Sequence, residues 1–135
     1  KFVNYPVISY ASGLCIKSLN NRPGIYSARL AKKKGGFHKA MKYILKKMEN
    51  KKNRSAIFVC GLSYKQPKKK PITVVGKIYG RVSLKILGNN GFGYDSIFIP
   101  NKEKKTFGQI SKYKKIKMDH RYIAFKKLKK KVKTL

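Results

Sequence analysis

Apolar residues recur at helical spacing between positions 37 and 48. Phe37, Met41, Ile44 and Met48 lie three or four residues apart, with lysines between them. Such spacing places the apolar side chains on one face of a helix and the charged side chains on the other. The pattern therefore predicts an amphipathic helix over this stretch.

A second helix is predicted near the C-terminal end. Asp119 is a residue type that caps helix N-termini, because its carboxylate accepts from a free backbone N–H. Ala124, Phe125, Leu128 and Val132 follow it with the spacing of a buried stripe. We therefore expect a helix that begins after Asp119 and packs through these four residues.

Strand signals fill much of the remaining chain. Residues 56–64 and 72–79 are rich in β-branched and aromatic residues, and a proline- and lysine-rich loop separates them. They predict an antiparallel hairpin with a basic tip. In the first part of the chain we expect a strand over 5–10, a turn at 12–13, a strand over 14–16, a loop over 20–24, a short helical turn over 25–30 and a basic break over 32–36. After the hairpin we expect extended chain over 80–87 and a strand over 97–99. A short helix over 106–110, capped by Thr106, and a lysine-rich connection over 112–117 are expected to follow.

The order strand, helix, hairpin, strand, helix predicts an α/β domain of mixed α+β type. A chain of 135 residues is long enough for one domain with a core. Residues 1–135 are therefore interpreted as a single domain with a basic C-terminal tail over 126–135. No apolar run approaches the ~18 residues that span a bilayer, so no membrane partner is expected. Cys15 and Cys60 lack any paired spacing and are predicted to be reduced, buried thiols.

The charge of the chain changes this picture. It has 35 Lys and Arg residues against 4 Asp and Glu residues, a net charge of +31. Lysine codons of an AT-rich genome would explain the excess of lysine over arginine, but not the scarcity of acids. A phosphate backbone is the natural partner of such a surface, because each neutralised phosphate releases a counterion.

The basic runs are the candidate RNA contacts, and aromatic residues interleaved with them, such as Tyr64 and Tyr113, are expected to stack on bases. For each run the alternative is a solvated face. The candidates are Lys32, Lys33, Lys34, Lys51, Lys52, Arg54, Lys68, Lys69, Lys70, Lys112, Lys114, Lys117, Lys126, Lys127, Lys129, Lys130, Lys131 and Lys133.

A glycine-rich stretch over 88–100 carries the other chemistry of the chain. Its three glycines allow sharp turns and a close approach to a ligand. Between and after them lie Phe92, Tyr94 and Asp95, followed by an apolar run. An aromatic face stacks on a purine ring and a carboxylate accepts from its edge, so this stretch is suited to hold a nucleobase.

Five segments, in this order, resemble one family, the inosine/xanthosine triphosphate pyrophosphatases. The resemblance implies that family's elongated mixed sheet with flanking helices and a nucleotide cleft between two lobes. The segments are Ser12-Gly-Leu14 with Pro23-Gly-Ile-Tyr-Ser-Ala-Arg29, Arg54-Ser-Ala-Ile-Phe-Val-Cys60, Gly76 with Gly80, Gly91-Phe-Gly-Tyr-Asp-Ser-Ile-Phe98, and Asp119-His-Arg121.

The same resemblance implies the site residues. Phe92 would stack on the base, Asp95 would accept from its edge, and Lys115, His120 and Arg121 would contact base and phosphate. Each has a structural alternative: the glycine loop serves the fold, Asp95 pairs with a nearby cation, and His120 and Arg121 cap a helix or contact an RNA phosphate. The full implied set is Ser12, Phe92, Gly93, Tyr94, Asp95, Lys115, His120 and Arg121.

The chain also departs from the family pattern at acidic positions. Tyr10 and Ala11 stand where the resemblance implies aspartates, the second of them for activating water, and Gln109 stands in place of a glutamate. The family's N-terminal portion is absent, so the resemblance is to a degenerate, N-terminally shortened member. The four acids of the chain show no paired spacing, so no catalytic carboxylate and no metal site are expected.

These observations lead to one main hypothesis. The chain is expected to be a catalytically inactive pyrophosphatase-like protein that binds RNA as a structural component of a ribosome, in a mitochondrion or another organelle. Its partners would then be ribosomal RNA and ribosomal proteins, with no cofactor.

Two alternative functions remain open. One is an active pyrophosphatase using Mg²⁺, with its missing groups supplied by an N-terminal part not seen here. Another is a sensor that binds a purine nucleotide without cleaving it. A homodimer is expected if the family's assembly is retained.

Overall fold

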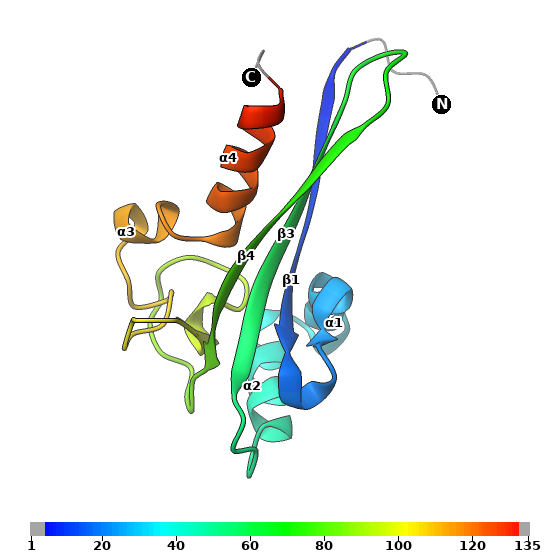
Figure 1. Ribbon diagram of the computed structural model, residues 1–135. Helices are drawn as coiled ribbons and strands as arrows, with labels where there is room; N and C mark the ends of the chain where they lie inside the picture. Colours follow the sequence, from blue (N-terminus) through cyan, green and yellow to red (C-terminus); the bar gives the residue numbers. More distant parts are fainter. Residues whose placement is uncertain (1–4, 133–135) are drawn as a thin grey trace.

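The computed structural model describes residues 5–132. Three long strands, β1 (Val7–Ile16), β3 (Ser55–Lys65) and β4 (Ile72–Val82), run through its whole length as a twisted ribbon (Figure 1). Two short strands, β2 (Arg22–Pro23) and β5 (Phe98–Pro100), complete a sheet of order β2-β1-β3-β4-β5. Every neighbouring pair within this part of the chain is antiparallel.

Helices flank this elongated sheet. Near one end lie α1 (Ser27–Lys34) and α2 (Phe37–Lys47), while α4 (His120–Lys131) packs along the β3–β4 hairpin (Figure 1). A five-residue helix, α3 (Lys112–Ile116), precedes α4. Three single turns of 3₁₀-helix complete the elements, η1 (Lys17–Leu19), η2 (Gly24–Tyr26) and η3 (Asp95–Ile97). The predicted fold, an elongated sheet with flanking helices, is confirmed.

The core forms two clusters beside β3, where burial alternates with the period of a strand. One cluster gathers Phe58 of β3 with Phe98, Phe107 and the buried face of α2. The other gathers Leu62 of β3 with residues of β4 and the buried face of α4. The sheet therefore connects two packed regions, one under α2 and one under α4.

Close contact between α4 and β4 depends on Gly76. A Cβ atom at this position would lie 2.3 Å from the carbonyl oxygen of His120 and 2.4 Å from the backbone nitrogen of Ala124. Both are backbone atoms of α4, so they cannot move away unless the whole helix moves. The absence of a side chain at Gly76 lets the helix that carries His120 lie directly on the sheet.

Several predictions of local structure are confirmed. The helix over 37–48, the 56–64 and 72–79 hairpin and the strand at 98–100 are present. Asp119 caps α4 as expected, because its Oδ1 accepts from the backbone N–H of Tyr122 at 2.8 Å. Ala124 and Leu128 lie in the core, but Phe125 is 42% exposed, so the predicted stripe is narrower than expected.

Other predictions of local structure are wrong. The turn at 12–13 does not exist, and β1 runs unbroken from Val7 to Ile16. Gly13 is a strand residue whose missing side chain makes room for the carbonyl oxygen of Gly24, which would lie 2.2 Å from a Cβ atom. The break over 32–36 is shorter than expected, because α1 continues to Lys34 and Gly35 is its C-cap.

The segment before α4 also differs from expectation. Thr106 does not open a helix; residues 107–109 form a turn in which Gln109 N donates to Thr106 O at 2.9 Å. The predicted connection over 112–117 is instead the helix α3, capped by the Ser111 side chain. The predicted basic tail begins inside α4, which extends to Lys131. Lys133 lies outside the described residues.

Candidate functional site

Asp95 and Lys115 form the centre of the candidate site. Their side chains lie 2.6 Å apart, Lys115 Nζ to Asp95 Oδ2, and both are almost fully buried. Asp95 Oδ2 also accepts from the backbone N–H of Phe92 at 2.9 Å. The ion pair therefore ties α3 to the glycine-rich loop and closes that loop on itself, which is the pairing that the sequence allowed as an alternative role for Asp95.

The glycines of the loop are required by this closure. Gly91 has a φ of +74°, and a Cβ atom there would lie 2.1 Å from Asp95 Oδ2. A side chain at this position would be strained by the backbone conformation and would collide with the carboxylate. The loop thus adopts its shape around the buried ion pair.

Phe92 is held at the surface by the same loop, and two cations lie near its ring. Lys115 Nζ lies 4.8 Å from the centre of its ring and the Arg121 guanidinium lies 4.5 Å from it. The ring is 59% exposed, an unusual position for a phenylalanine. An exposed aromatic face flanked by cations suits a planar, electron-rich ligand that carries hydrogen-bond acceptors.

Arg121 is available to such a ligand. Its NH1 lies 4.0 Å from Asp119 Oδ2, which is a long contact for an ion pair. Its Nε is buried and has no hydrogen-bond partner within residues 5–132. A buried donor without a partner is unfavourable, so a ligand acceptor at this point would stabilise the site.

His120 lies behind these residues and connects them to β1. Its ring stacks on Phe58, with 4.7 Å between ring centres, and its Nε2 lies 2.5 Å from Ser12 Oγ. Burial and, to a smaller extent, the positive charges of Arg121 and Lys115 lower the pKa of His120 to about 3. The imidazole is therefore neutral at physiological pH.

The structure thus brings most of the sequence-predicted site residues together, although one has a different role. Asp95, Lys115, Phe92 and Arg121 are in contact, and Ser12 reaches His120. Tyr94, however, is only 4% exposed, and its hydroxyl donates to the carbonyl oxygen of Ser27 at 2.6 Å. Burial raises the pKa of Tyr94 to about 12. Tyr94 therefore holds the loop onto α1.

Gly93 is the last of the predicted site residues, and it contributes to the backbone conformation of the loop. It has a φ of +63°, and a Cβ atom there would lie 3.8 Å from the Phe37 ring, an ordinary contact. The conformation, rather than the available space, favours glycine at this position. Phe37 meets the ring of Tyr94 edge-on at 5.2 Å, so the loop packs against the start of α2.

The substituted acidic positions lie beside this cluster along β1 and in the turn before α3. Tyr10 is 63% exposed and therefore does not fill a cavity. Ala11 is exposed as well, and Gln109 uses its side-chain oxygen to accept from the backbone N–H of Thr106. None of the three positions supplies a carboxylate.

The carboxylates that the chain does have do not fit a magnesium ion. Asp95 is committed to Lys115, Asp119 caps α4, and Glu103 pairs with Lys114 Nζ at 3.0 Å. Glu49 follows the end of α2 and is exposed. No group of three or more His, Cys, Asp or Glu side chains that could hold a metal ion occurs within residues 5–132. These residues therefore offer no cluster of carboxylates that would hold a divalent cation by itself.

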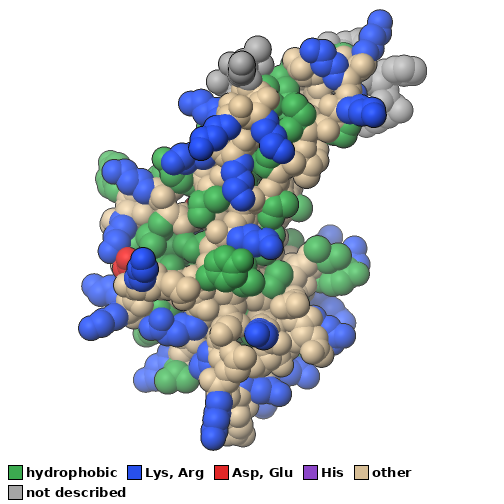
Figure 2. Space-filling model, in the orientation of Figure 1, with side chains coloured by type: hydrophobic (Ala, Val, Ile, Leu, Met, Phe, Trp, Pro, Cys, Tyr) green, Lys and Arg blue, Asp and Glu red, His purple; other side chains and the backbone are tan. Residues whose placement is uncertain are grey.

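The basic surface is broad and not focused on one groove. Figure 2 shows Lys and Arg side chains over the whole visible face, with only a small acidic area. Two predicted RNA contacts have structural roles instead. Arg54 donates to the carbonyl oxygens of Met48, Val82 and Ser83. Tyr64 is only 6% exposed and cannot stack on a base.

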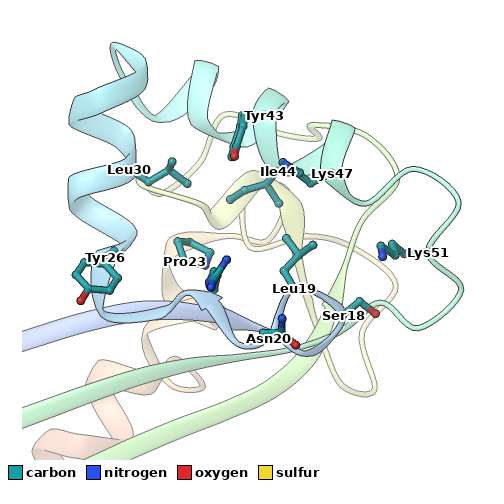
Figure 3. Close-up of a pocket in the computed structure, with 11 residues that line it drawn as sticks. Ser18, Leu19, Asn20, Pro23, Tyr26, Leu30, Tyr43, Ile44, Lys47 and Lys51 are labelled. Atoms are coloured by element: carbon teal, nitrogen blue, oxygen red, sulfur yellow. The ribbon is translucent and has the colours of Figure 1, made fainter.

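One feature had no signal in the sequence analysis. A pocket of about 460 Å³ lies between η1, β2 and the two helices α1 and α2 (Figure 3). Its walls come from separate parts of the chain, residues 18–26, Leu30 and residues 43–51. Of these, only Pro23 and Tyr26 belong to a family motif, and that motif does not by itself indicate a pocket. It shares no residue with the cluster around Phe92.

The chain is similar to several proteins named dITP/XTP pyrophosphatase. The chain is 43% identical over 129 residues to the dITP/XTP pyrophosphatase of Wigglesworthia glossinidia brevipalpis, a match that covers 92% of this chain and 65% of that protein. It is 41% identical over 116 residues to the dITP/XTP pyrophosphatase of Methanopyrus kandleri, covering 86% of this chain and 59% of that protein. The chain therefore spans about two thirds of the length of such relatives.

These relatives overturn the main functional expectation. Proteins this similar over most of the chain carry the name of a pyrophosphatase and not of a ribosomal component. The interpretation as an RNA-binding protein of an organellar ribosome, with ribosomal RNA and ribosomal proteins as partners, is therefore wrong. The net charge led to a wrong prediction, because a basic surface attracts polyanions in general and does not identify a particular polyanion as the partner.

Solved structures give the same result for the fold. The Staphylococcus aureus Ham1 protein superposes with a TM-score of 0.91 at 36% identity, covering 98% of this chain and 69% of that one. A HAM1 protein from Coxiella burnetii superposes with a TM-score of 0.89 at 28% identity, covering 97% and 68%. The model of the Ham1 family matches residues 1–131. With five motifs in order, the same fold and this match over nearly its full length, the chain belongs to the Ham1 family.

Proposed function

We propose that this chain is the base-binding part of a pyrophosphatase that removes pyrophosphate from deaminated purine nucleoside triphosphates. The observation that carries the proposal is the exposed ring of Phe92 beside Lys115 and Arg121. The relatives named dITP/XTP pyrophosphatase support it.

The charges around Phe92 support a preference for deaminated bases. Deamination of adenine replaces an amino group, which donates, by a carbonyl oxygen, which accepts. Lys115 and Arg121 have only donors. A purine stacked on Phe92 would therefore satisfy these cations through a carbonyl oxygen, whereas the amino group of adenine would face like donors.

The buried layer behind the cations fixes their positions. Asp95 holds Lys115 at 2.6 Å, and Asp119 caps the helix that begins at His120 and carries Arg121. His120 is neutral and stacks on Phe58, so it adds no charge that would repel the cations. Such pre-positioned groups lose little entropy when a ligand binds.

Cleavage requires groups that residues 5–132 do not provide. Charge on the phosphates must be compensated and a water molecule activated, which in such reactions is commonly the work of a metal ion held by carboxylates. The carboxylates of these residues are committed elsewhere or isolated. In this proposal the metal ligands and the base for water therefore come from a part of the protein outside the described residues.

Calorimetric titration of this chain with inosine triphosphate and with adenosine triphosphate, at matched salt, tests base recognition. The proposal expects inosine triphosphate to bind at least about tenfold more tightly, since one hydrogen bond to a charged donor is gained and one repulsive contact avoided. Equal affinities would show attraction of the phosphates alone and would contradict the proposal.

A further inference from the structure

The pocket beside α1 and α2 is a second concave site, separate from the Phe92 cluster (Figure 3). Its volume of about 460 Å³ is in the range of small-molecule sites. It is lined by Ser18, Leu19, Asn20, Arg22, Pro23, Tyr26, Leu30, Tyr43, Ile44, Lys47 and Lys51.

The floor of the pocket is apolar and its sides are aromatic. Pro23 and Ile44 are buried, and Leu30 is half-buried. Tyr26 is 52% exposed and Tyr43 is 37% exposed. The Arg29 guanidinium lies 5.3 Å from the centre of the Tyr26 ring, and Lys47 Nζ lies 5.6 Å from the centre of the Tyr43 ring. In Figure 3, Pro23 and Leu30 lie between the two tyrosines. A flat ring is the shape that such a surface accepts.

The rim of the pocket is cationic, and no acidic side chain of the pocket lining balances its charge. Arg22, Lys47 and Lys51 line it, and none of them forms an ion pair within residues 5–132. A fourth cation, Lys34, lies with its Nζ 3.9 Å from the centre of the Tyr43 ring. No acid lines the pocket. A ligand that enters it is therefore favoured if it is anionic.

We propose that this pocket binds a nucleotide, with the base against Tyr26, Tyr43 and the apolar floor and the phosphate at the cationic rim. Arg22 offers a planar fork that matches two phosphate oxygens, and Lys47 and Lys51 add point charges. Inorganic phosphate would use only the rim, and a neutral aromatic ring would use only the floor. A nucleotide has both parts, a flat base and an anionic phosphate.

The experiment is a titration of the ¹⁵N-labelled chain with adenosine 5′-monophosphate, followed by amide chemical shifts. This probe suits the test because adenine is the base that the Phe92 site is proposed to disfavour, so the two sites are distinguished. We expect saturable shifts at Asn20, Leu30 and Ile44, the same shifts in a Phe92→Ala variant, and markedly weaker binding of inorganic phosphate.

A matched pair of variants tests the rim. Lys47→Glu/Lys51→Glu should weaken binding at least about tenfold, since two attractive charges become repulsive. Lys46→Glu/Lys52→Glu makes the same change in net charge at exposed neighbours that do not line the pocket, and should change affinity by less than about twofold. Arg22→Gln, which introduces no new charge, should also weaken binding.

Three results would overturn the proposal. The first is equal weakening by both lysine pairs, which would indicate general attraction to a basic surface. The second is a set of shifts confined to residues 88–95 and α4. The third is the absence of saturable shifts, as would follow if another segment of the protein filled the pocket.

Discussion

Lys115 Nζ and Asp95 Oδ2 lie 2.6 Å apart, and the two side chains retain only 8% and 4% of their exposed surface. The pair joins α3 to the glycine-rich loop and places Lys115 beside Phe92. A buried ion pair is not necessarily more stable than a packed apolar pair, but removal of one partner leaves an uncompensated buried charge.

Asp95→Asn is therefore expected to destabilise the protein by about 3 kcal/mol, in the range for broken buried pairs. Denaturant unfolding followed by circular dichroism measures this. The control is Glu103→Gln, which removes the more exposed pair with Lys114 and should cost less than about 1 kcal/mol. Similar losses in the two variants would show that the Asp95 pair does not hold the loop.

The stability of the protein should depend on pH through His120. Its pKa is about 3 in the folded protein and 6.5 in its reference state. Between these values the unfolded chain binds a proton that the folded chain does not. The contribution is therefore complete above pH 6.5 and is lost as pH falls toward 3, at about 1.4 kcal/mol per pH unit.

Unfolding free energies measured from pH 6.5 to pH 4.5, above the range of most carboxylates, isolate this effect. A His120→Phe variant should show a shallower slope than the wild type, whatever its absolute stability. Exposed His38 provides the comparison, and His38→Gln should keep the wild-type slope. Equal slopes in all three proteins would contradict the assignment.

Two neighbouring glycines should respond in opposite ways to alanine. Gly76→Ala places a Cβ atom 2.3 Å from the His120 carbonyl oxygen, so α4 must move away from the sheet, at a cost of at least about 2 kcal/mol. Gly61→Ala, on the adjacent strand, meets nothing within 4 Å and should leave stability unchanged or raise it by less than about 1 kcal/mol.

Thermal unfolding compares the two glycine variants directly. Gly76→Ala should also change the amide shifts of His120 and Arg121, because the first turn of α4 is displaced. Unchanged shifts at these residues together with full stability would mean that α4 does not rest on Gly76.

Phe92→Ala should reduce affinity for inosine triphosphate without reducing stability. Stacking of a base on an aromatic ring contributes about 1–3 kcal/mol, so the loss should be at least about fivefold. The ring is 59% exposed, so its removal opens no core cavity. Tyr113→Ala, at a tyrosine that is 86% exposed, is the control, and calorimetric titration should find its affinity unchanged.

The sequence predicts those parts of the fold whose signals are local. The spacing of Met41 and Ile44 reveals α2, and the side chain of Asp119 reveals the start of α4, because periodicity and capping act within a few residues. Gly13 shows the limit. It resembles a turn residue, yet it lies inside a strand to accommodate a carbonyl oxygen from Gly24, a contact between separate segments.

The candidate site also has a part that the sequence predicts and a part that it does not. The family motifs contain Phe92 and Arg121, the resemblance as a whole implies Lys115, and the contacts of the three residues agree with a common site. The burial of Tyr94 follows from packing on α1, which no local pattern encodes. The pocket beside α2 is likewise assembled from separate segments. The net charge was the least reliable guide to function, because it carries no information about the shape of a binding site.

Pyrophosphate release by the protein at its natural length, with Mg²⁺ and either inosine triphosphate or adenosine triphosphate, tests the proposed function most directly. The proposed function predicts release from inosine triphosphate at least about tenfold faster than from adenosine triphosphate at low substrate concentration, with this preference lost in Phe92→Ala. Absence of release from inosine triphosphate, or equal rates for the two substrates, would contradict it.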